Sequence, residues 1–227
     1  MSYRYPIGIN EWYHCFNRGV DKRKTFVDGR DYARFEALLY IGNSEKPVHV
    51  SNMRESSLAY IVNDTSLKRG EPLVEIGAYA LMPSHPHLVL KEIRENGISM
   101  FMQKVFTAYT MYFNKRHERT GALFAGPFKS KHIADDRYFK KCIAYVHMNP
   151  VELIEPRWKE GKGNVRSIES FLGDYRYSSL TAFSSPKDIR RKVLGESVFD
   201  AFEKIPTVTR MLEEAQSYYA QNIKASP

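Results

Sequence analysis

Residues 79–90 read Tyr79-Ala-Leu-Met-Pro-Ser-His85-Pro-His87-Leu-Val-Leu90, two apolar runs separated by a Met-Pro-Ser break. The partly β-branched flanks predict a strand, a bend and a second strand that begins near the histidines. Side chains at i and i+2 of a strand leave the same face, so His85 and His87 would present two imidazoles side by side. Two ligands of one metal ion need this geometry. Packed core histidines can show the same spacing, so the motif alone leaves both interpretations open.

Patterns elsewhere in the chain predict the remaining elements. Strands are expected at 12–18, 73–81, 87–90 and 128–133, with a further strand-like run at 58–62. Helices are expected at 28–40, 99–117 and 135–149, and Asp28 and Asp135 are suitable N-caps. This order of strands and helices indicates an α+β fold, an antiparallel β-sheet with helices packed on it.

Three segments depart from this pattern. Residues 44–72 are largely polar, and because connections of this length are uncommon in compact domains we predict an insertion. Residues 151–184 are expected to be mostly irregular. Beyond them two helices are predicted, at 187–203 and 207–223, with Pro206 at the start of the second.

The composition limits the class of protein. The chain has 227 residues, 43% of them apolar, which suits one large domain or one domain with an extension. No segment approaches a membrane span and the N-terminus has no signal-peptide pattern, which predicts a cytoplasmic protein. Cys15 and Cys142 share no short motif, so neither a disulfide framework nor a cysteine zinc site is expected.

The net charge of +8 points to a polyanionic partner. Between Phe101 and Ala134 the only carboxylate is Glu118, and cations alternate with aromatic residues. Cations interleaved with rings suit single-stranded nucleic acid, although most of these rings are expected in the core. The candidate DNA-binding cations of this stretch are Lys104, Lys115, Arg116, Arg119, Lys129 and Lys131.

The predicted helix 135–149 carries a candidate nucleophile. Tyr145 and Asn149 are four residues apart and share one helical face, with Lys141 one turn before Tyr145. An amide oxygen is a suitable ligand for Mg²⁺ or Mn²⁺, and histidines join it readily for Mn²⁺. Lys141 could favour the phenolate of Tyr145 or bind a phosphate oxygen. A tyrosine opposite a two-histidine strand suits phosphodiester cleavage, in which tyrosine attacks and a metal ion polarises the scissile phosphate.

Four blocks of the sequence carry a resemblance to a known family. They are Tyr13-His14-Cys15-Phe16-Asn17-Arg18-Gly19, residues 78–88 around His85-Pro86-His87, Gly121-Ala122-Leu123-Phe124 with Phe128-Lys129-Ser130, and Tyr145-Val146-His147-Met148-Asn149-Pro150-Val151. In this order they resemble the single-tyrosine HUH transposases, and more narrowly the REP-associated tyrosine transposases. The resemblance runs from about residue 8 to 184.

The resemblance implies a fold and a mechanism. It implies a ferredoxin-like (RRM-like) antiparallel sheet flanked by helices, as a domain over 1–184 with an insertion at 44–72 and a helical extension over 185–227. It implies Mg²⁺ or Mn²⁺ held by His85, His87 and Asn149, and a 5′-phosphotyrosine bond from Tyr145 to single-stranded DNA. Hairpin-flanked DNA, a nucleoid-associated location and a possible homodimer follow from it.

One departure and several alternatives accompany this interpretation. Pro86 replaces the bulky aliphatic residue usual between the histidines, and because it cannot donate to a strand ladder it suggests an edge or bulge position. A domesticated protein that binds hairpin DNA without cutting it is one alternative. A metallohydrolase of small phosphate esters is another, and a purely structural role of the histidines is the third.

Overall fold

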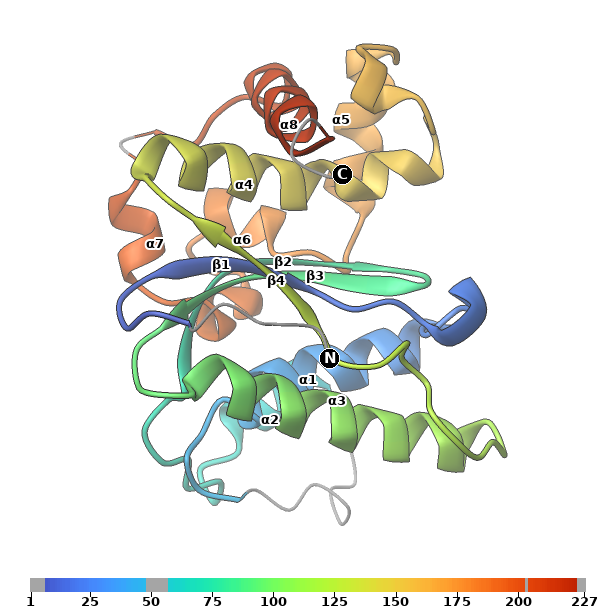
Figure 1. Ribbon diagram of the computed structural model, residues 1–227, viewed down its shortest axis with the longest axis vertical. Helices are drawn as coiled ribbons and strands as arrows, with labels where there is room; N and C mark the ends of the chain where they lie inside the picture. Colours follow the sequence, from blue (N-terminus) through green and yellow to red (C-terminus); the bar gives the residue numbers. More distant parts are fainter. Residues whose placement is uncertain (1–6, 48–56, 203, 224–227) are drawn as a thin grey trace.

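The computed structural model describes residues 7–47, 57–202 and 204–223. Within these ranges, the antiparallel strands β1 (Trp12–Phe16), β2 (Val74–Met82), β3 (His85–Glu92) and β4 (Lys129–Ile133) form a four-stranded sheet of order β2-β3-β1-β4. Helix α1 (Gly29–Ile41) follows β1 and helix α3 (Gly97–Arg116) follows β3. Both helices cover the same face of the sheet (Figure 1). This is the ferredoxin-like arrangement, and the predicted α+β fold is confirmed.

The opposite face of the sheet is covered by helices from the second half of the chain. Helix α4 (Asp136–Met148) lies on it, and α8 (Val208–Ile223) packs along α4 (Figure 1). Asp135 caps α4 as predicted, because its carboxylate accepts a hydrogen bond from the backbone N–H of Tyr138. None of the helices in the described ranges is long and apolar enough to cross a membrane.

The β2–β3 hairpin closes through the two-residue turn Pro83-Ser84, so the predicted bend is present. The carbonyl of Pro83 accepts hydrogen bonds from Thr25 and Phe26, which fixes the turn against the segment after β1. Pro86 has the expected edge position locally: β3 is a central strand, but Pro86 pairs with Leu81 of β2 and lies beyond the residues that pair with β1. Its missing N–H is tolerated since the pairing of β1 with β3 ends at His87, and Pro86 lies beyond it.

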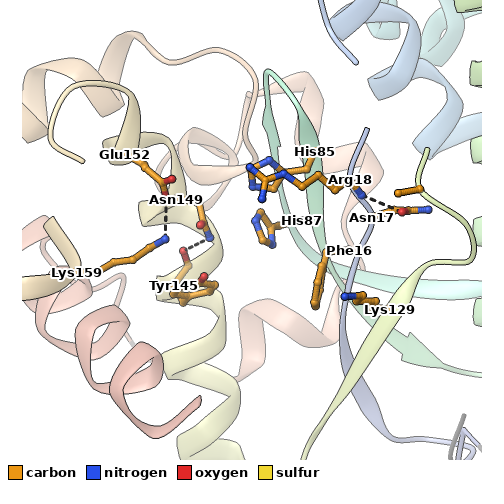
Figure 2. Close-up of a pocket in the computed structure, with 11 residues that line it drawn as sticks. Phe16, Asn17, Arg18, His85, His87, Lys129, Tyr145, Asn149, Glu152 and Lys159 are labelled. Carbon is orange, nitrogen blue, oxygen red and sulfur yellow. Dashed lines mark hydrogen bonds and ion pairs between the residues drawn. The ribbon is translucent and has the colours of Figure 1, made fainter. Parts of the chain in front are cut away.

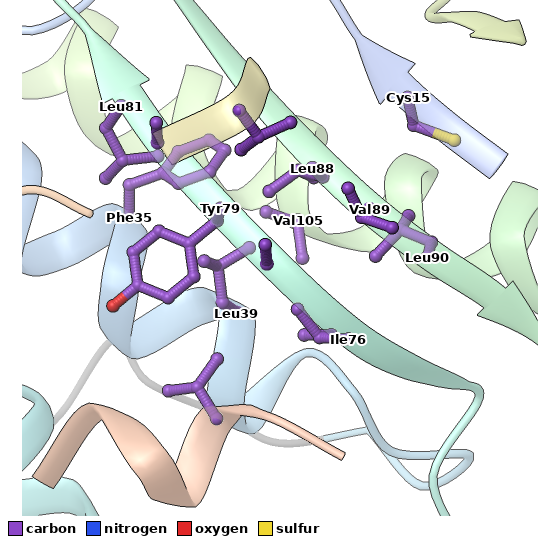
Figure 3. Packing of buried hydrophobic residues seen from close by; sticks show 14 of the residues in the cluster. Cys15, Phe35, Leu39, Ile76, Tyr79, Leu81, Leu88, Val89, Leu90 and Val105 are labelled. Carbon is purple, nitrogen blue, oxygen red and sulfur yellow. The ribbon is translucent and has the colours of Figure 1, made fainter. Parts of the chain in front are cut away.

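The core between the sheet and its first helical layer is apolar and continuous. Phe35 and Leu39 of α1 and Val105 of α3 pack on Ile76 and other buried side chains of β2 and β3 (Figure 3). The same cluster continues onto the α4 side of the sheet, and the predicted C-terminal extension contributes to it through Val193, Leu194, Val198 and Tyr218. A second cluster of buried side chains joins α4 and α8 to helix α5 (Val165–Asp174) and to Trp158.

Two predictions about local structure in these segments are wrong. Residues 58–62 are not a strand but part of helix α2 (Leu58–Asn63), because Ser57 caps it and Leu58 and Ile61 are buried at helical spacing. Residues 151–184 are mostly helical. They contain η2 (Asn149–Leu153), η3 (Trp158–Glu160), α5 and α6 (Leu180–Ser184). Residues 48–56 of the predicted insertion lie outside the described ranges.

The predicted helix 187–203 is two short pieces, η4 (Ile189–Val193) and α7 (Ser197–Asp200). Gly195 interrupts it, and its backbone N–H donates to the carbonyl of Ile76 at the edge of β2. The predicted helix 207–223 is confirmed as α8. Just before α6, the bridge between Ser178 and Ala80 also lies along this edge.

Glu36 of α1 makes the stability of the fold depend on pH. The hydroxyl of Tyr79 donates to its carboxyl group at 2.8 Å, and burial raises the pKa of Glu36 to about 7. The folded protein therefore holds a proton that the unfolded chain releases near pH 4.5. This contribution to stability is complete below about pH 4.5 and is lost as the pH rises through 7.

We expect Glu36→Gln to be more stable than the wild type at pH 8, by roughly 1–3 kcal/mol, and nearly equal to it at pH 4. Glutamine keeps an oxygen for the Tyr79 hydroxyl and never ionises. Urea unfolding at both pH values measures the difference. Glu169→Gln, a change at an exposed glutamate, is the matched control and should follow the wild type. A pH-independent difference for Glu36→Gln would contradict the prediction.

Candidate functional site

The predicted histidines, tyrosine and asparagine meet at one cavity of about 440 Å³ between α4 and the sheet. His85 and His87 come from the start of β3. Tyr145 comes from the last turn of α4 and Asn149 directly follows this helix, and both face the histidines (Figure 2). The ring centroids of His85 and His87 are 4.9 Å apart, and those of His87 and Tyr145 are 6.1 Å apart. The residues that line the cavity are Phe16, Asn17, Arg18, His85, His87, Ala125, Lys129, Tyr145, Asn149, Glu152 and Lys159.

Each of the two histidines is held by a hydrogen bond at Nδ1. The Nδ1 atom of His85 lies 2.9 Å from the hydroxyl of Ser84, and the Nδ1 atom of His87 lies 2.9 Å from Nε2 of His14. Both Nε2 atoms have no hydrogen-bond partner in the part of the chain that the structure describes. Histidines that bind a metal through one nitrogen are commonly oriented through the other, so this arrangement suits two Nε2 ligands.

Electrostatics keeps the imidazoles neutral. Burial lowers the pKa of His85 to about 4, and it lowers the pKa of His87 far below its ordinary value. A neutral imidazole is the form that binds a metal ion. The histidine pair therefore offers two unprotonated nitrogens at neutral pH, provided that each Nδ1 carries the proton.

Asn149 supplies the third candidate ligand at the C-terminal end of α4. Its side-chain nitrogen donates to the backbone carbonyl of Tyr145 at 2.8 Å, which leaves the side-chain oxygen for another partner. Two nitrogens and one amide oxygen suit Mn²⁺ or Mg²⁺. Among the described residues there is no group of three or more histidine, cysteine, aspartate or glutamate side chains that could hold a metal ion. A site with three protein ligands at this cavity therefore requires the side-chain amide of Asn149 in addition to the two histidines.

The environment of Tyr145 differs from the prediction in one respect. Burial, and to a lesser degree the nearby carboxylate of Glu152, raises the pKa of the Tyr145 phenol well above its ordinary value. The expectation that Lys141 favours the phenolate is wrong. Lys141 lies in a groove between α4 and α8, beside Asp136, Glu213 and Glu214, and does not line the cavity.

A different lysine, Lys159, lies beside the candidate nucleophile Tyr145. The ammonium of Lys159 is 5.9 Å from the centre of the Tyr145 ring and 2.7 Å from a carboxylate oxygen of Glu152. Figure 2 shows this ion pair at the cavity next to Asn149. Sequence reasoning missed both residues, because they follow the last motif block in a segment expected to be irregular. Arg18, which also lines the cavity, belongs to the first block but was not singled out.

The predicted DNA-binding cations divide between the two faces of the sheet. Lys129 and Lys131 of β4 lie opposite Phe16 and His14 of β1, on the face that carries the histidine pair. The other four lie on or just after α3, on the opposite face, and are Lys104, Lys115, Arg116 and Arg119.

Three of the four have polar partners within the chain, and that of Arg119 is the side-chain oxygen of Asn114 at 3.0 Å. The ammonium of Lys104 donates to the carbonyls of Ser44 and Lys46. Arg116 forms ion pairs with Asp28 and with the fully buried Asp31. The expectation that these two bind DNA is therefore not supported, because Lys104 is already engaged by two backbone carbonyls and Arg116 by two carboxylates.

Comparison with known proteins agrees with the fold. No protein-family model matches the sequence, and no curated protein matches it. Among solved structures the chain resembles a REP-associated tyrosine transposase bound to a REP hairpin, with a TM-score of 0.53 and 12% sequence identity. The match covers 91% of this chain and 99% of that one. At this identity the similarity establishes the fold.

Proposed function

We propose that this protein is a metal-dependent enzyme that cleaves and rejoins single-stranded DNA through a 5′-phosphotyrosine at Tyr145. The observation that carries the proposal is the cavity in which Tyr145 and Asn149 of α4 face His85 and His87 of β3. The partner of the structurally similar transposase is a REP hairpin, which supports hairpin-flanked DNA as the substrate here.

His85 and His87 would hold Mg²⁺ or Mn²⁺ through their Nε2 atoms, with the side-chain oxygen of Asn149 as the third ligand. The ion, when bound, would polarise a non-bridging oxygen of the scissile phosphate. The hydrogen bonds that the two Nδ1 atoms make with Ser84 and His14 support this assignment, since they restrain both rings.

The proposed cleavage is a transesterification that conserves the number of phosphodiester bonds. The phenolic oxygen of Tyr145 attacks the phosphorus, the bond from phosphorus to the 3′ oxygen breaks, and the 3′ oxygen leaves as a hydroxyl. The phenol loses its proton as the bond forms. In the reverse step a 3′ hydroxyl attacks the phosphotyrosine and returns the proton to Tyr145. No oxidant, nucleotide or other energy source is needed.

The cations around the cavity would bind the DNA backbone. Lys129, Arg18 and Lys159 line the cavity itself, and Lys131 continues the positive charge along β4. Lys115, Arg119 and Lys141 lie away from the cavity, and we assign them to DNA that flanks the cleavage site.

Three alternatives are less well supported. A protein that binds hairpin DNA without cutting it has no need of two oriented histidines that face a tyrosine across a cavity. A hydrolase of small phosphate esters would attack with water, and a tyrosine beside the ligands would then have no role. A structural role of the histidines leaves unexplained why both side chains line a cavity.

The decisive experiment uses an oligonucleotide with a hairpin and single-stranded flanks, incubated with the protein and Mn²⁺. We expect a covalent adduct that survives denaturation. A 5′-phosphotyrosine attaches the protein to the fragment downstream of the cut, so a label at the 3′ end should appear in the adduct. A label at the 5′ end should appear in a free fragment that ends in a hydroxyl. Binding without any adduct would favour the non-cleaving alternative.

A further inference from the structure

Three buried polar side chains from distant parts of the chain form a continuous row behind the histidine pair. Nε2 of His14 lies 2.9 Å from Nδ1 of His87, and Nδ1 of His14 lies 3.2 Å from the hydroxyl of Tyr218. The exposed fractions of His14, His87 and Tyr218 are 4%, 6% and 2%. The row therefore runs from helix α8, through β1, to the candidate metal ligand on β3.

The fold brings these residues together through two independent packings. The pairing of β1 with β3 places Phe16 opposite His87, and His14 is two residues before Phe16, so it lies on the same face of the sheet. Helix α8 packs along α4 and places the ring of Tyr218 4.8 Å from the ring of Tyr145. The hydroxyl of Tyr218 also contacts Cys142 and Tyr138, which fixes its position.

The direction of the hydrogen bonds decides whether His87 can bind a metal ion at Nε2. If the Nδ1–H of His87 donates to His14, and the Nδ1–H of His14 donates to the Tyr218 oxygen, the Nε2 lone pair of His87 faces the cavity. If both bonds run in the opposite direction, Nε2 of His87 carries the proton and cannot be a ligand. The ligand-competent arrangement thus needs acceptors at His14 and at Tyr218.

We propose that His14 and Tyr218 are positioning residues that fix the tautomer and ring orientation of His87, so that helix α8 completes the metal site. The inference rests on the proposed function, since it takes His87 as a ligand. It assigns a role to a segment outside the sequence blocks that resemble the HUH transposases, which run from about residue 8 to 184. Outer partners of this kind commonly change metal affinity by ~10–100-fold when they are removed.

Calorimetric titration of the full-length protein with Mn²⁺ tests the assignment without DNA. His14→Phe keeps a ring but removes both nitrogens, and its Mn²⁺ affinity should fall ~10–100-fold. His14→Gln returns an acceptor to His87 and should recover part of that loss. His147→Phe is the matched control, because His147 is also buried and its Nε2 bonds to Ser179, away from the cavity. Its Mn²⁺ affinity should equal that of the wild type.

Tyr218→Phe provides a second variant that removes one oxygen and keeps the ring stacking. Its Mn²⁺ affinity should fall about tenfold, and with Co²⁺ as the probe its visible spectrum should differ from that of the wild type. Wild-type affinity and an unchanged Co²⁺ spectrum in this variant would overturn the inference, even if His14→Phe failed to fold. If the wild type itself bound no Mn²⁺, the metal site of the proposed function would be overturned, and the positioning role with it.

Discussion

Replacing Tyr145 by phenylalanine should abolish the covalent protein–DNA adduct and reduce strand cleavage to background, a loss on the order of 10⁴-fold or more. The change removes a single oxygen, which is the proposed nucleophile. The ring remains to pack on Tyr218 at 4.8 Å and on Trp158, so the fold and the binding of hairpin DNA should persist. Denaturing gels measure the adduct and the cleaved fragments, and fluorescence anisotropy measures hairpin binding.

Two control variants separate the role of Tyr145 from that of other tyrosines. Tyr138 is two turns earlier on α4 and does not line the cavity, so Tyr138→Phe should still form the adduct. Tyr112→Phe makes the same chemical change on α3, across the sheet, and should cleave like the wild type. An adduct that persists in Tyr145→Phe and disappears in Tyr138→Phe would move the nucleophile to Tyr138.

Short-range patterns were sufficient to predict the α+β class, whereas the ferredoxin-like arrangement was expected from the family resemblance. The strand, turn and strand around Pro83, and the capped helix that begins after Asp135, follow from periodicity and turn chemistry within a few residues. The failures lie where tertiary packing overrides such patterns. Residues 58–62 are rich in β-branched and aromatic side chains, yet they are helical because Leu58 and Ile61 are buried at helical spacing. Gly195 ends a predicted helix because its N–H pairs with the edge of the sheet.

The residues of the candidate site likewise fall into two groups, those that local patterns predict and those that depend on tertiary packing. His85, His87, Tyr145 and Asn149 could be chosen from their spacing together with the resemblance of the four sequence blocks, and the structure brings them to one cavity. Contacts between segments that are distant in the sequence could not be predicted in this way. The hydrogen bond between His14 and His87 joins residues that are 73 positions apart, and the one between His14 and Tyr218 joins residues that are 204 apart. Neither contact has a local sequence signal.

The cations show a related difficulty. The charge pattern between Phe101 and Ala134 does not reveal that the cations of α3 and those of β4 lie on opposite faces of the sheet. It also does not show that Arg116 is needed by two carboxylates, one of them fully buried. Charge that is contiguous in sequence was therefore a poor guide to charge that is contiguous on the surface.

Removal of either histidine from the candidate metal site should have the second large effect. His87→Ala removes a ligand outright, and Mn²⁺ affinity measured by calorimetry should fall ~100-fold or more, with metal-dependent cleavage lost. His85→Ala should do the same. His132→Ala is the control, because His132 is an exposed histidine of β4 whose Nε2 pairs with Glu11 at 2.7 Å. Its Mn²⁺ affinity should not change.

The two histidine variants should differ in stability, and this difference distinguishes loss of a ligand from loss of the fold. His87 is buried, and its removal leaves Nε2 of His14 without its partner, so His87→Ala should also lower the free energy of unfolding by about 1–3 kcal/mol. His85 is only partly buried and bonds to Ser84 at the turn, so His85→Ala should unfold much like the wild type. Loss of Mn²⁺ binding in a fully stable His85→Ala would show that the metal site, and not the fold, had been removed. Unchanged Mn²⁺ affinity in both variants would mean that the pair is not a metal site, and cleavage would then need another source of phosphate activation.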